Sequence, residues 1–172
     1  NLRKAFLRSP LEFSRVTSGF STSRFHPVLQ INRAHKGIDY GAPIGTKVRS
    51  VADGTVEFAG WQGGFGKLLI IRHQGPYSTA YGHLNGFATG IKKGAKVAQG
   101  ETIGYTGQTG LSSGPHLHYE FRVNATQVNP QTIALPQSLP LDPHQIGRFK
   151  QAIEPAREQL ALAQQVWPTN AE

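Results

Sequence analysis

The sequence contains no cysteine and no methionine. Without cysteine the chain has no disulfide bond, no thiolate metal site and no cysteine nucleophile, although this absence does not decide the compartment. Any chemistry must come from histidine, carboxylate, hydroxyl or amine side chains. Because the chain begins with Asn1 and lacks methionine altogether, we expect it to be a processed or excised part of a longer product, in which a preceding domain regulates it.

Long apolar runs are also missing. No stretch approaches the ~18 apolar residues of a membrane-spanning helix, and no charged segment followed by an apolar one opens the chain, so we expect no transmembrane span. The 172 residues are instead rich in turn formers, with 20 glycines and 11 prolines. Hydrophobic residues make up 38%, which is enough for the core of one β-rich domain.

Acidic residues are scarce, 10 against 18 Lys and Arg, and the formal net charge is +8. Half of the basic residues fall within residues 1–49, where only Glu12 and Asp39 oppose them. Such a surface favours an anionic partner: nucleic acid, anionic lipid or an acidic wall polymer. A nucleic-acid-binding β domain would interleave aromatic residues with the basic ones, and this chain does not, so we expect no nucleic-acid partner.

Short apolar segments broken by glycines predict a mainly β fold, an antiparallel β-sheet domain over residues 1–135. Asp53-Gly54, flanked by two alternating segments, predicts a two-residue hairpin. A second turn is expected at Gly75-Pro76. Near the C-terminal end of the chain, prolines and apolar residues at helical spacing indicate a Pro-rich linker and a short helical C-terminal appendage over residues 136–172.

The segment "GPHLHYEF" places His116 and His118 one residue apart in a predicted strand. Residues two apart in a strand project to the same face, so both imidazoles could converge on one centre. A second segment, "HKGIDY", places His35 and Asp39 on either side of a glycine, whose flexibility would let both turn toward one ion. A catalytic zinc site needs three protein ligands and one open position, and these four residues, with His83 of "YGHL" as a fifth, are the candidates.

In combination, "SRFHP", "HKGID", "YGHL" and "GPHLHYEF" resemble the lysostaphin-like, or LytM-domain, zinc metallopeptidases over roughly residues 9–130. The resemblance implies a β fold with an active-site groove and one Zn²⁺ bound by His35, Asp39 and His118. It also implies that His83 and His116 act in catalysis beside a water activated by the metal. The sequence leaves open which of the two histidines is the general base.

Four other side chains lie near these motifs. Glu120 shares the face of His118 and is a candidate for orienting it, although a structural hydrogen bond at the strand end is favoured. Tyr81 shares the strand face of His83 and could serve an oxyanion, although a packed tyrosine is favoured. His73 is interpreted as structural. Ser112 of "GLSSG" matches a hydrolase nucleophile motif, which is rejected because a strand, not a helix, is expected after it.

The resemblance implies an endopeptidase that cuts peptide cross-links of peptidoglycan. The lead-in around "SRFHP" is closer to the Gram-negative branch, which implies cleavage of D-alanyl to meso-diaminopimelate bonds in the periplasm or cell envelope. Two alternatives are cleavage of glycyl-glycine bridges and a non-catalytic module that activates cell-wall amidases. With carboxylate-bearing wall peptides as substrate, we expect the activity to fall as salt rises.

Overall fold

The computed structural model describes residues 5–26, 31–133, 151 and 153–155. Residues 4–137 form one compact unit, which carries the site. Within it lie one short 3₁₀ helix, η1 (Gly63–Phe65), and twelve strands. The strands are β1 (Arg15–Ser18), β2 (Ser21–His26), β3 (Ile31–His35), β4 (Ile38–Gly41), β5 (Lys47–Arg49), β6 (Gly54–Trp61), β7 (Lys67–Arg72), β8 (Tyr77–Phe87), β9 (Lys96–Val97), β10 (Thr102–Thr106), β11 (His116–Val123) and β12 (Thr126–Val128).

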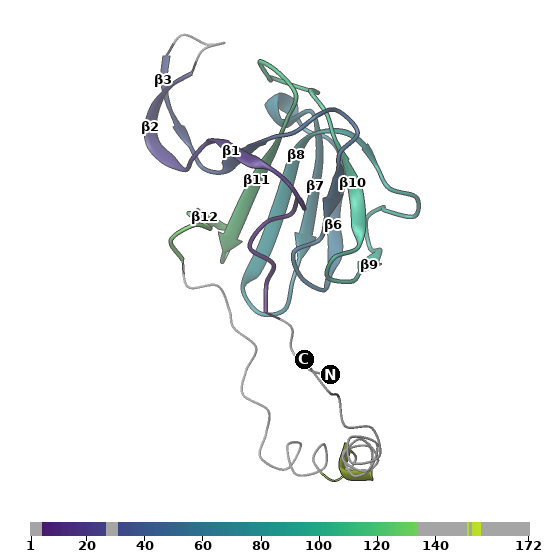
Figure 1. The fold of residues 1–172 in the computed structure, drawn as a ribbon. Coiled ribbons are helices and arrows are strands. Elements are labelled where there is room, and N and C mark those ends of the chain that lie inside the picture. Colours follow the sequence, from purple (N-terminus) through teal and green to yellow (C-terminus); the bar gives the residue numbers. More distant parts are fainter. Residues whose placement is uncertain (1–4, 27–30, 134–150, 152, 156–172) are drawn as a thin grey trace, which may run out of the picture. The chain divides into compact units, whose positions relative to one another are not determined.

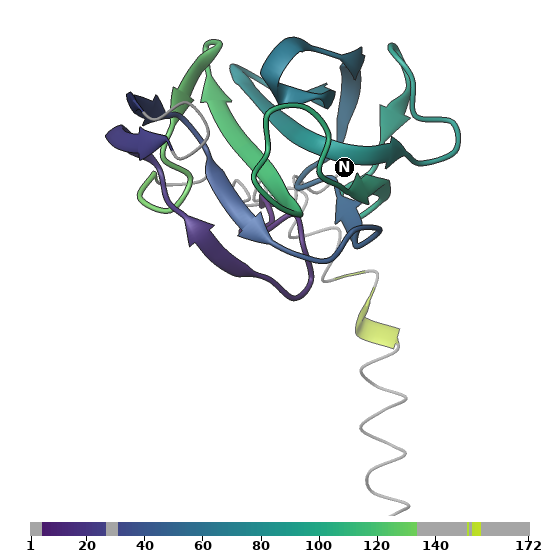
Figure 2. The same cartoon turned by 90° about the horizontal axis from the view of Figure 1, so that it is seen from above.

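The expected antiparallel β fold is confirmed. One sheet runs in the order β1-β4-β11-β8-β7-β6-β9, with β10 pairing β5 and β8, and β12 pairing β11; β2 and β3 form a separate hairpin. Figure 1 shows β11, β8, β7 and β6 side by side, and Figure 2 shows that the sheet is curved rather than flat. Register shifts interrupt several ladders, including β6·β7 and β7·β8, and such bulges bend a sheet.

The prediction of a hairpin at Asp53-Gly54 is wrong, because the strands on either side of it do not pair with each other. The strand before it, β5, pairs with β10, whereas β6 pairs with β7 and β9. Gly54 is needed for packing instead, because a Cβ there would lie 2.6 Å from Ile71 Cγ2 and 2.7 Å from the Arg72 carbonyl oxygen. The turn at Gly75-Pro76 does join two antiparallel strands, β7 and β8, as expected.

The core explains how the site is presented. Along β11 the side chains of Leu117, Tyr119 and Phe121 enter the buried apolar cluster, and burying each contributes about 1.5–3 kcal/mol. The alternate residues, among them His118 and Glu120, project to the other face and line a groove. The apolar half of the strand therefore holds the polar half in position.

The predicted linker and helical tail lie largely outside the described residues. Gln151 and residues 153–155 are helical, and the remainder of 136–172 is not described. Within the part of the chain that is described, no helix has the length and apolar character needed to cross a membrane.

Candidate metal centre and active-site groove

The three predicted zinc ligands meet at one point. The antiparallel pairing of β4 with β11 sets Asp39 directly opposite His118, and β3 ends at His35. Asp39 Oδ1 lies 3.0 Å from His35 Nε2 and 2.9 Å from His118 Nδ1, and these two nitrogens are 3.2 Å apart. All three residues are buried. Residues from three strands thus bring one carboxylate oxygen and two imidazole nitrogens together.

The hydrogen bonds of the outer nitrogens of His35 and His118 indicate which nitrogen of each ring carries the proton. His35 Nδ1 donates to the Gly19 carbonyl oxygen at 2.8 Å, and His118 Nε2 faces Glu120 Oε1 at 3.3 Å, so each outer nitrogen carries a proton. In a neutral imidazole the inner nitrogen then presents a lone pair. Two such lone pairs point at the Asp39 oxygen, itself an acceptor. Either protonated imidazoles or one shared cation resolves this, and a metal ion satisfies all three atoms at once.

The electrostatics of the cluster favour positive charge. Burial raises the pKa of Asp39, but the hydrogen bonds to His118 and His35 outweigh it and hold that pKa well below its usual range. For His118 burial lowers the pKa, yet Asp39 and Glu120 on either side outweigh the burial and raise it. The same two carboxylates would attract a divalent cation.

Glu120 makes the structural hydrogen bonds that the sequence favoured, and it also faces the imidazole of His118. It is 2% exposed, and its Oε2 accepts hydrogen bonds from Arg122 Nε at 2.8 Å and Gln127 Nε2 at 3.4 Å. Its other oxygen faces His118 Nε2. A carboxylate held from behind in this way fixes the ring and tautomer of a metal-binding histidine.

Gly37, between His35 and Asp39, has a different role from the predicted flexibility. A Cβ at this position would lie 2.6 Å from His118 Cε1 and 2.8 Å from the Tyr119 carbonyl oxygen. Only a glycine lets the chain pass so close to the His118 ring. The pattern of His35 and Asp39 around a glycine therefore reflects space for the third ligand.

His83 and His116 lie beside this centre. Their ring centroids are 4.7 Å apart, and His116 Nε2 is 3.7 Å from Asp39 Oδ1. His83 Nδ1 donates to the Thr109 carbonyl oxygen at 2.7 Å, and His116 Nδ1 donates to that of Gly114 at 2.8 Å. Both tautomers leave Nε2 as the proton acceptor. Burial lowers the pKa of His83 to about 4, which keeps its imidazole neutral near pH 7.

A break in the alternation of β8 brings His83 into the groove. His83 has φ 57°, a left-handed conformation that non-glycine residues rarely adopt. In an unbroken strand His83 would share the face of Tyr81, as the sequence suggested. Tyr81 instead lies in the core at 0% exposure, with its hydroxyl 3.0 Å from Thr79 Oγ1, so it is excluded from an oxyanion role. No feature of the sequence predicted this break in the alternation of β8.

Thr109 ties the loop between β10 and β11 to the sheet, and sequence reasoning missed it. Its Oγ1 accepts a hydrogen bond from the Lys67 backbone N–H at 3.0 Å and donates to the Leu84 carbonyl oxygen at 2.8 Å. Its own carbonyl oxygen binds His83. The hydroxyl of one threonine thereby anchors the carbonyl that orients His83.

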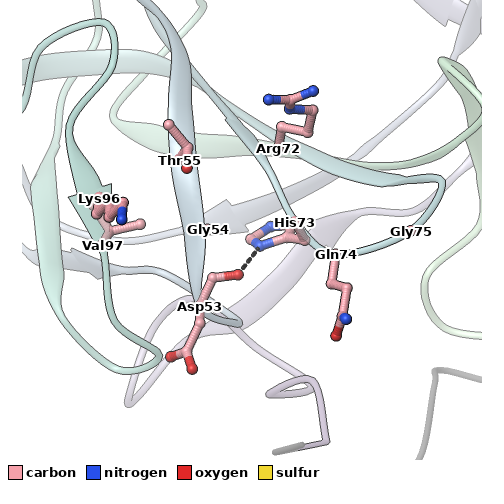
Figure 3. Close-up of a pocket in the computed structure, with 9 residues that line it drawn as sticks. All are labelled: Asp53, Gly54, Thr55, Arg72, His73, Gln74, Gly75, Lys96 and Val97. Carbon is pink, nitrogen blue, oxygen red and sulfur yellow. Dashed lines mark hydrogen bonds between the residues drawn. The ribbon is translucent and has the colours of Figure 1, made fainter.

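Two other predicted residues have structural contacts. Ser112 Oγ donates to the Gly114 carbonyl oxygen at 2.7 Å and lies in the loop between β10 and β11, with no strand-turn-helix around it. Although its Oγ is 3.2 Å from His116 Nδ1, that nitrogen already donates to Gly114 and cannot act as its base. His73 lines a separate hollow with Asp53, where Figure 3 shows its hydrogen bond to the Asp53 carbonyl oxygen.

The groove around the five site residues has a volume of about 970 Å³. Its walls come from the end of β1, the turn of η1, and the loop that precedes β11, which contribute Thr17, Phe65 and Leu111 among others. The lining is mixed polar and apolar.

Comparison with known proteins places this arrangement in a family. The model of peptidase family M23 matches residues 33–130. The chain is 48% identical over 137 residues to the peptidoglycan DD-endopeptidase ShyC of Vibrio cholerae, covering 80% of this chain and 31% of that protein. It is 48% identical over 127 residues to the DD-carboxypeptidase/endopeptidase Mpg of Neisseria meningitidis, covering 74% and 29%. The chain thus spans about a third of the length of these curated relatives.

Solved structures agree. A zinc-containing peptidase from Vibrio cholerae superposes with a TM-score of 0.72 at 38% identity, covering 78% of this chain and 41% of that one. The catalytic domain of lysostaphin from Staphylococcus simulans superposes with a TM-score of 0.60 at 29% identity, covering 69% and 90%. The matched family segment includes all five residues of the site, and the chain belongs to peptidase family M23.

Proposed function

We propose that this protein is a zinc-dependent endopeptidase that hydrolyses peptide cross-links of peptidoglycan, at the bond from D-alanyl to meso-diaminopimelate. The observation that carries the proposal is the convergence of three lone pairs, from His35 Nε2, Asp39 Oδ1 and His118 Nδ1, beside two further imidazoles. The names of the relatives, peptidoglycan DD-endopeptidases and a zinc-containing peptidase, support the substrate and the metal.

The donor set suits zinc, which accepts imidazole nitrogen and carboxylate oxygen in a four-coordinate site with one open position. His35, Asp39 and His118 would hold the ion, with the Gly19 carbonyl and Glu120 fixing the two rings. When bound, zinc supplies Lewis-acid polarisation of the scissile carbonyl and lowers the pKa of water.

His83 and His116 would manage the protons of the reaction. Hydrolysis adds water to the carbonyl carbon, breaks the C–N bond and delivers a proton to the leaving amine. A neutral imidazole Nε2 in the groove can accept the proton of the attacking water and return it to the amine, while the other imidazole donates a hydrogen bond to the oxyanion. The carbonyl oxygens of Thr109 and Gly114 hold both rings in the tautomer this requires.

The complete set of site residues favours an enzyme over a non-catalytic activator of amidases. An activator does not need four buried polar side chains and the half-buried His116 around one groove, because unused buried polar groups cost stability. Digestion of purified diaminopimelate-type and glycine-bridged cell walls separates the two endopeptidase specificities. We expect cleavage of the first, in line with the names of the Gram-negative relatives, and place the protein in the periplasm or cell envelope.

The test is zinc content together with cleavage of purified cross-linked muropeptides, for the parent and for His116→Ala and Asp39→Ala. We expect about one zinc per chain in the parent and in His116→Ala, and little zinc in Asp39→Ala, with activity only in the parent. A parent that binds zinc and cuts no cross-link would argue for the activator. A parent without zinc would overturn the metal centre.

A further inference from the structure

The charged side chains that line the groove differ in whether they have a hydrogen-bond or ionic partner. Two carboxylates line it: Asp39 faces the imidazoles of the metal centre, and Glu120 is held by His118 and Arg122. Among the described lining residues, Lys36 is the only lysine or arginine. Neither carboxylate forms an ion pair with Lys36.

Lys36 stands next to the proposed metal centre, and its ammonium group is unpaired among the described residues. It follows His35 directly, in the connection between β3 and β4, and its side chain is exposed. Among the residues that the structure describes, it makes no hydrogen bond or ion pair. An exposed ammonium group at the wall of a groove attracts an anion that enters the groove. A carboxylate of the substrate can supply this anion.

The chemistry of the proposed substrates supplies that anion. In a carboxypeptidase substrate, the residue on the amine side of the scissile bond bears a free α-carboxylate. In a D-alanyl to diaminopimelate cross-link, the amine belongs to the D-centre of diaminopimelate, and that centre also bears a free carboxylate. One Neisseria relative is named for both reactions, DD-carboxypeptidase and endopeptidase. The shared feature of the two substrates is a carboxylate one carbon from the scissile nitrogen.

We propose that Lys36 binds the free carboxylate of the residue that supplies the amine of the scissile bond. This inference rests on the proposed function and adds a determinant of specificity to it. A charge-assisted hydrogen bond from the ammonium group would hold the leaving-group side of the substrate next to the metal and the two catalytic imidazoles. Bonds inside a glycine bridge have no carboxylate at this position, so Lys36 would favour the diaminopimelate type.

The experiment uses two substrates and four proteins. The substrates are a cross-linked diaminopimelate tetrapeptide dimer with this carboxylate free and the same dimer with it converted to the carboxamide. The proteins are the parent, Lys36→Met, Lys36→Arg and the control Lys47→Met. Lys47 is an exposed lysine of β5 that does not line the groove. Zinc content is measured for each protein, because Lys36 adjoins a proposed ligand.

We expect Lys36→Met to lower kcat/KM on the free carboxylate by about 10- to 100-fold, the loss typical of a hydrogen bond to a charged group. On the carboxamide, the parent and Lys36→Met should be equal, and Lys36→Arg should keep most of the preference of the parent. Equal losses of Lys36→Met on both substrates, or a parent without preference between them, would overturn the inference while leaving the endopeptidase function intact. A parent that cleaves neither dimer would overturn the proposed function itself and this inference with it.

Discussion

The protein has two groups of buried imidazoles, His73 in one and His35 with His118 in the other. They differ in the hydrogen-bond partners of their ring nitrogens. In the hollow of Figure 3, His73 Nδ1 donates to the Asp53 carbonyl oxygen at 2.9 Å, and Nε2 lies 2.8 Å from Thr79 Oγ1, a hydroxyl that can turn to donate or accept. Every polar atom of that ring has a complementary partner. At the metal centre, His35 and His118 each satisfy one nitrogen and aim the other at a carboxylate oxygen.

The difference teaches that burial alone does not identify a metal ligand. His73, His35 and His118 are all less than 9% exposed. What separates them is the balance of donors and acceptors: the surroundings of His73 are balanced, whereas the other two rings leave an excess of acceptors that a cation removes. The chemistry of the partners therefore distinguishes a structural histidine from a functional one.

The comparison is tested most severely by removing one ring from each group. His118→Ala deletes a proposed metal ligand, and because loss of the Lewis acid costs several kcal/mol of transition-state stabilisation, we expect activity to fall by about 1,000-fold or more. His73→Ala should keep its zinc and most of its activity at temperatures where it remains folded. Zinc analysis and muropeptide cleavage measure both. Loss of zinc from His73→Ala would mean that the two groups are not distinct.

A smaller effect is expected behind the metal centre. Glu120→Gln keeps the shape of the side chain but removes the charge that faces His118 Nε2, and we expect zinc affinity to weaken by about 10- to 100-fold. Competition with a chromophoric chelator measures the affinity directly. The control is Gln127→Ala, which removes a weaker contact of the same carboxylate at 3.4 Å, leaves its charge unchanged and should keep the zinc affinity of the parent. An unchanged affinity in Glu120→Gln would show that Glu120 has only a packing role.

The loop that orients His83 offers a third test. Thr109→Val removes the hydroxyl that bonds the Lys67 N–H and the Leu84 carbonyl, and each backbone group left unpaired costs about 1–3 kcal/mol of stability. Because the loop then holds the Thr109 carbonyl and the His83 ring less firmly, we expect kcat to fall by about 10-fold. KM and zinc content should change little. Thr109→Ser, which keeps the hydroxyl, should restore the rate, and Gln108→Ala is an exposed neighbour for control. Failure of the serine variant to restore kcat would contradict the positioning role.

The smallest effect concerns stability near His73. Burial lowers the pKa of His73 in the folded protein below its ordinary 6.5, despite opposing contributions from Asp53. Its neutral form is therefore favoured by folding, and its contribution to stability is complete above pH 6.5 and lost as the pH falls toward the folded pKa. We expect His73→Gln to be about 1–3 kcal/mol less stable at pH 8, with the gap narrowing below pH 6.5. Urea denaturation at several pH values checks this, and a constant gap would contradict it.

Much of the fold and the site was predictable because it depends on local periodicity. The alternation of "HLHYEF" correctly placed His116 and His118 on the face opposite Leu117 and Tyr119, since that pattern follows from the pleat of a strand. The β class followed from short apolar segments between glycines. These features need no knowledge of the partner strands.

What could not be predicted depends on contacts between distant segments. The prediction of a hairpin at Asp53-Gly54 was wrong because packing decides which strands pair. A glycine is needed at position 54 because a side chain there would clash with Ile71 and Arg72. The positive φ of His83 is a local strain held by the surrounding strands and has no signature in "YGHL". The bonds of Thr109 to Lys67 and Leu84 span 42 and 25 residues.

The central claim is that three inner atoms converge on one metal ion, and the most direct measurement is a crystal structure of the zinc-loaded protein with data collected at the zinc absorption edge. We predict one anomalous peak, about 2.0–2.2 Å from His35 Nε2, Asp39 Oδ1 and His118 Nδ1. The outer nitrogens of both rings should keep their contacts with Gly19 and Glu120. A peak at His73 or between His83 and His116, or no peak at these three atoms, would contradict the account.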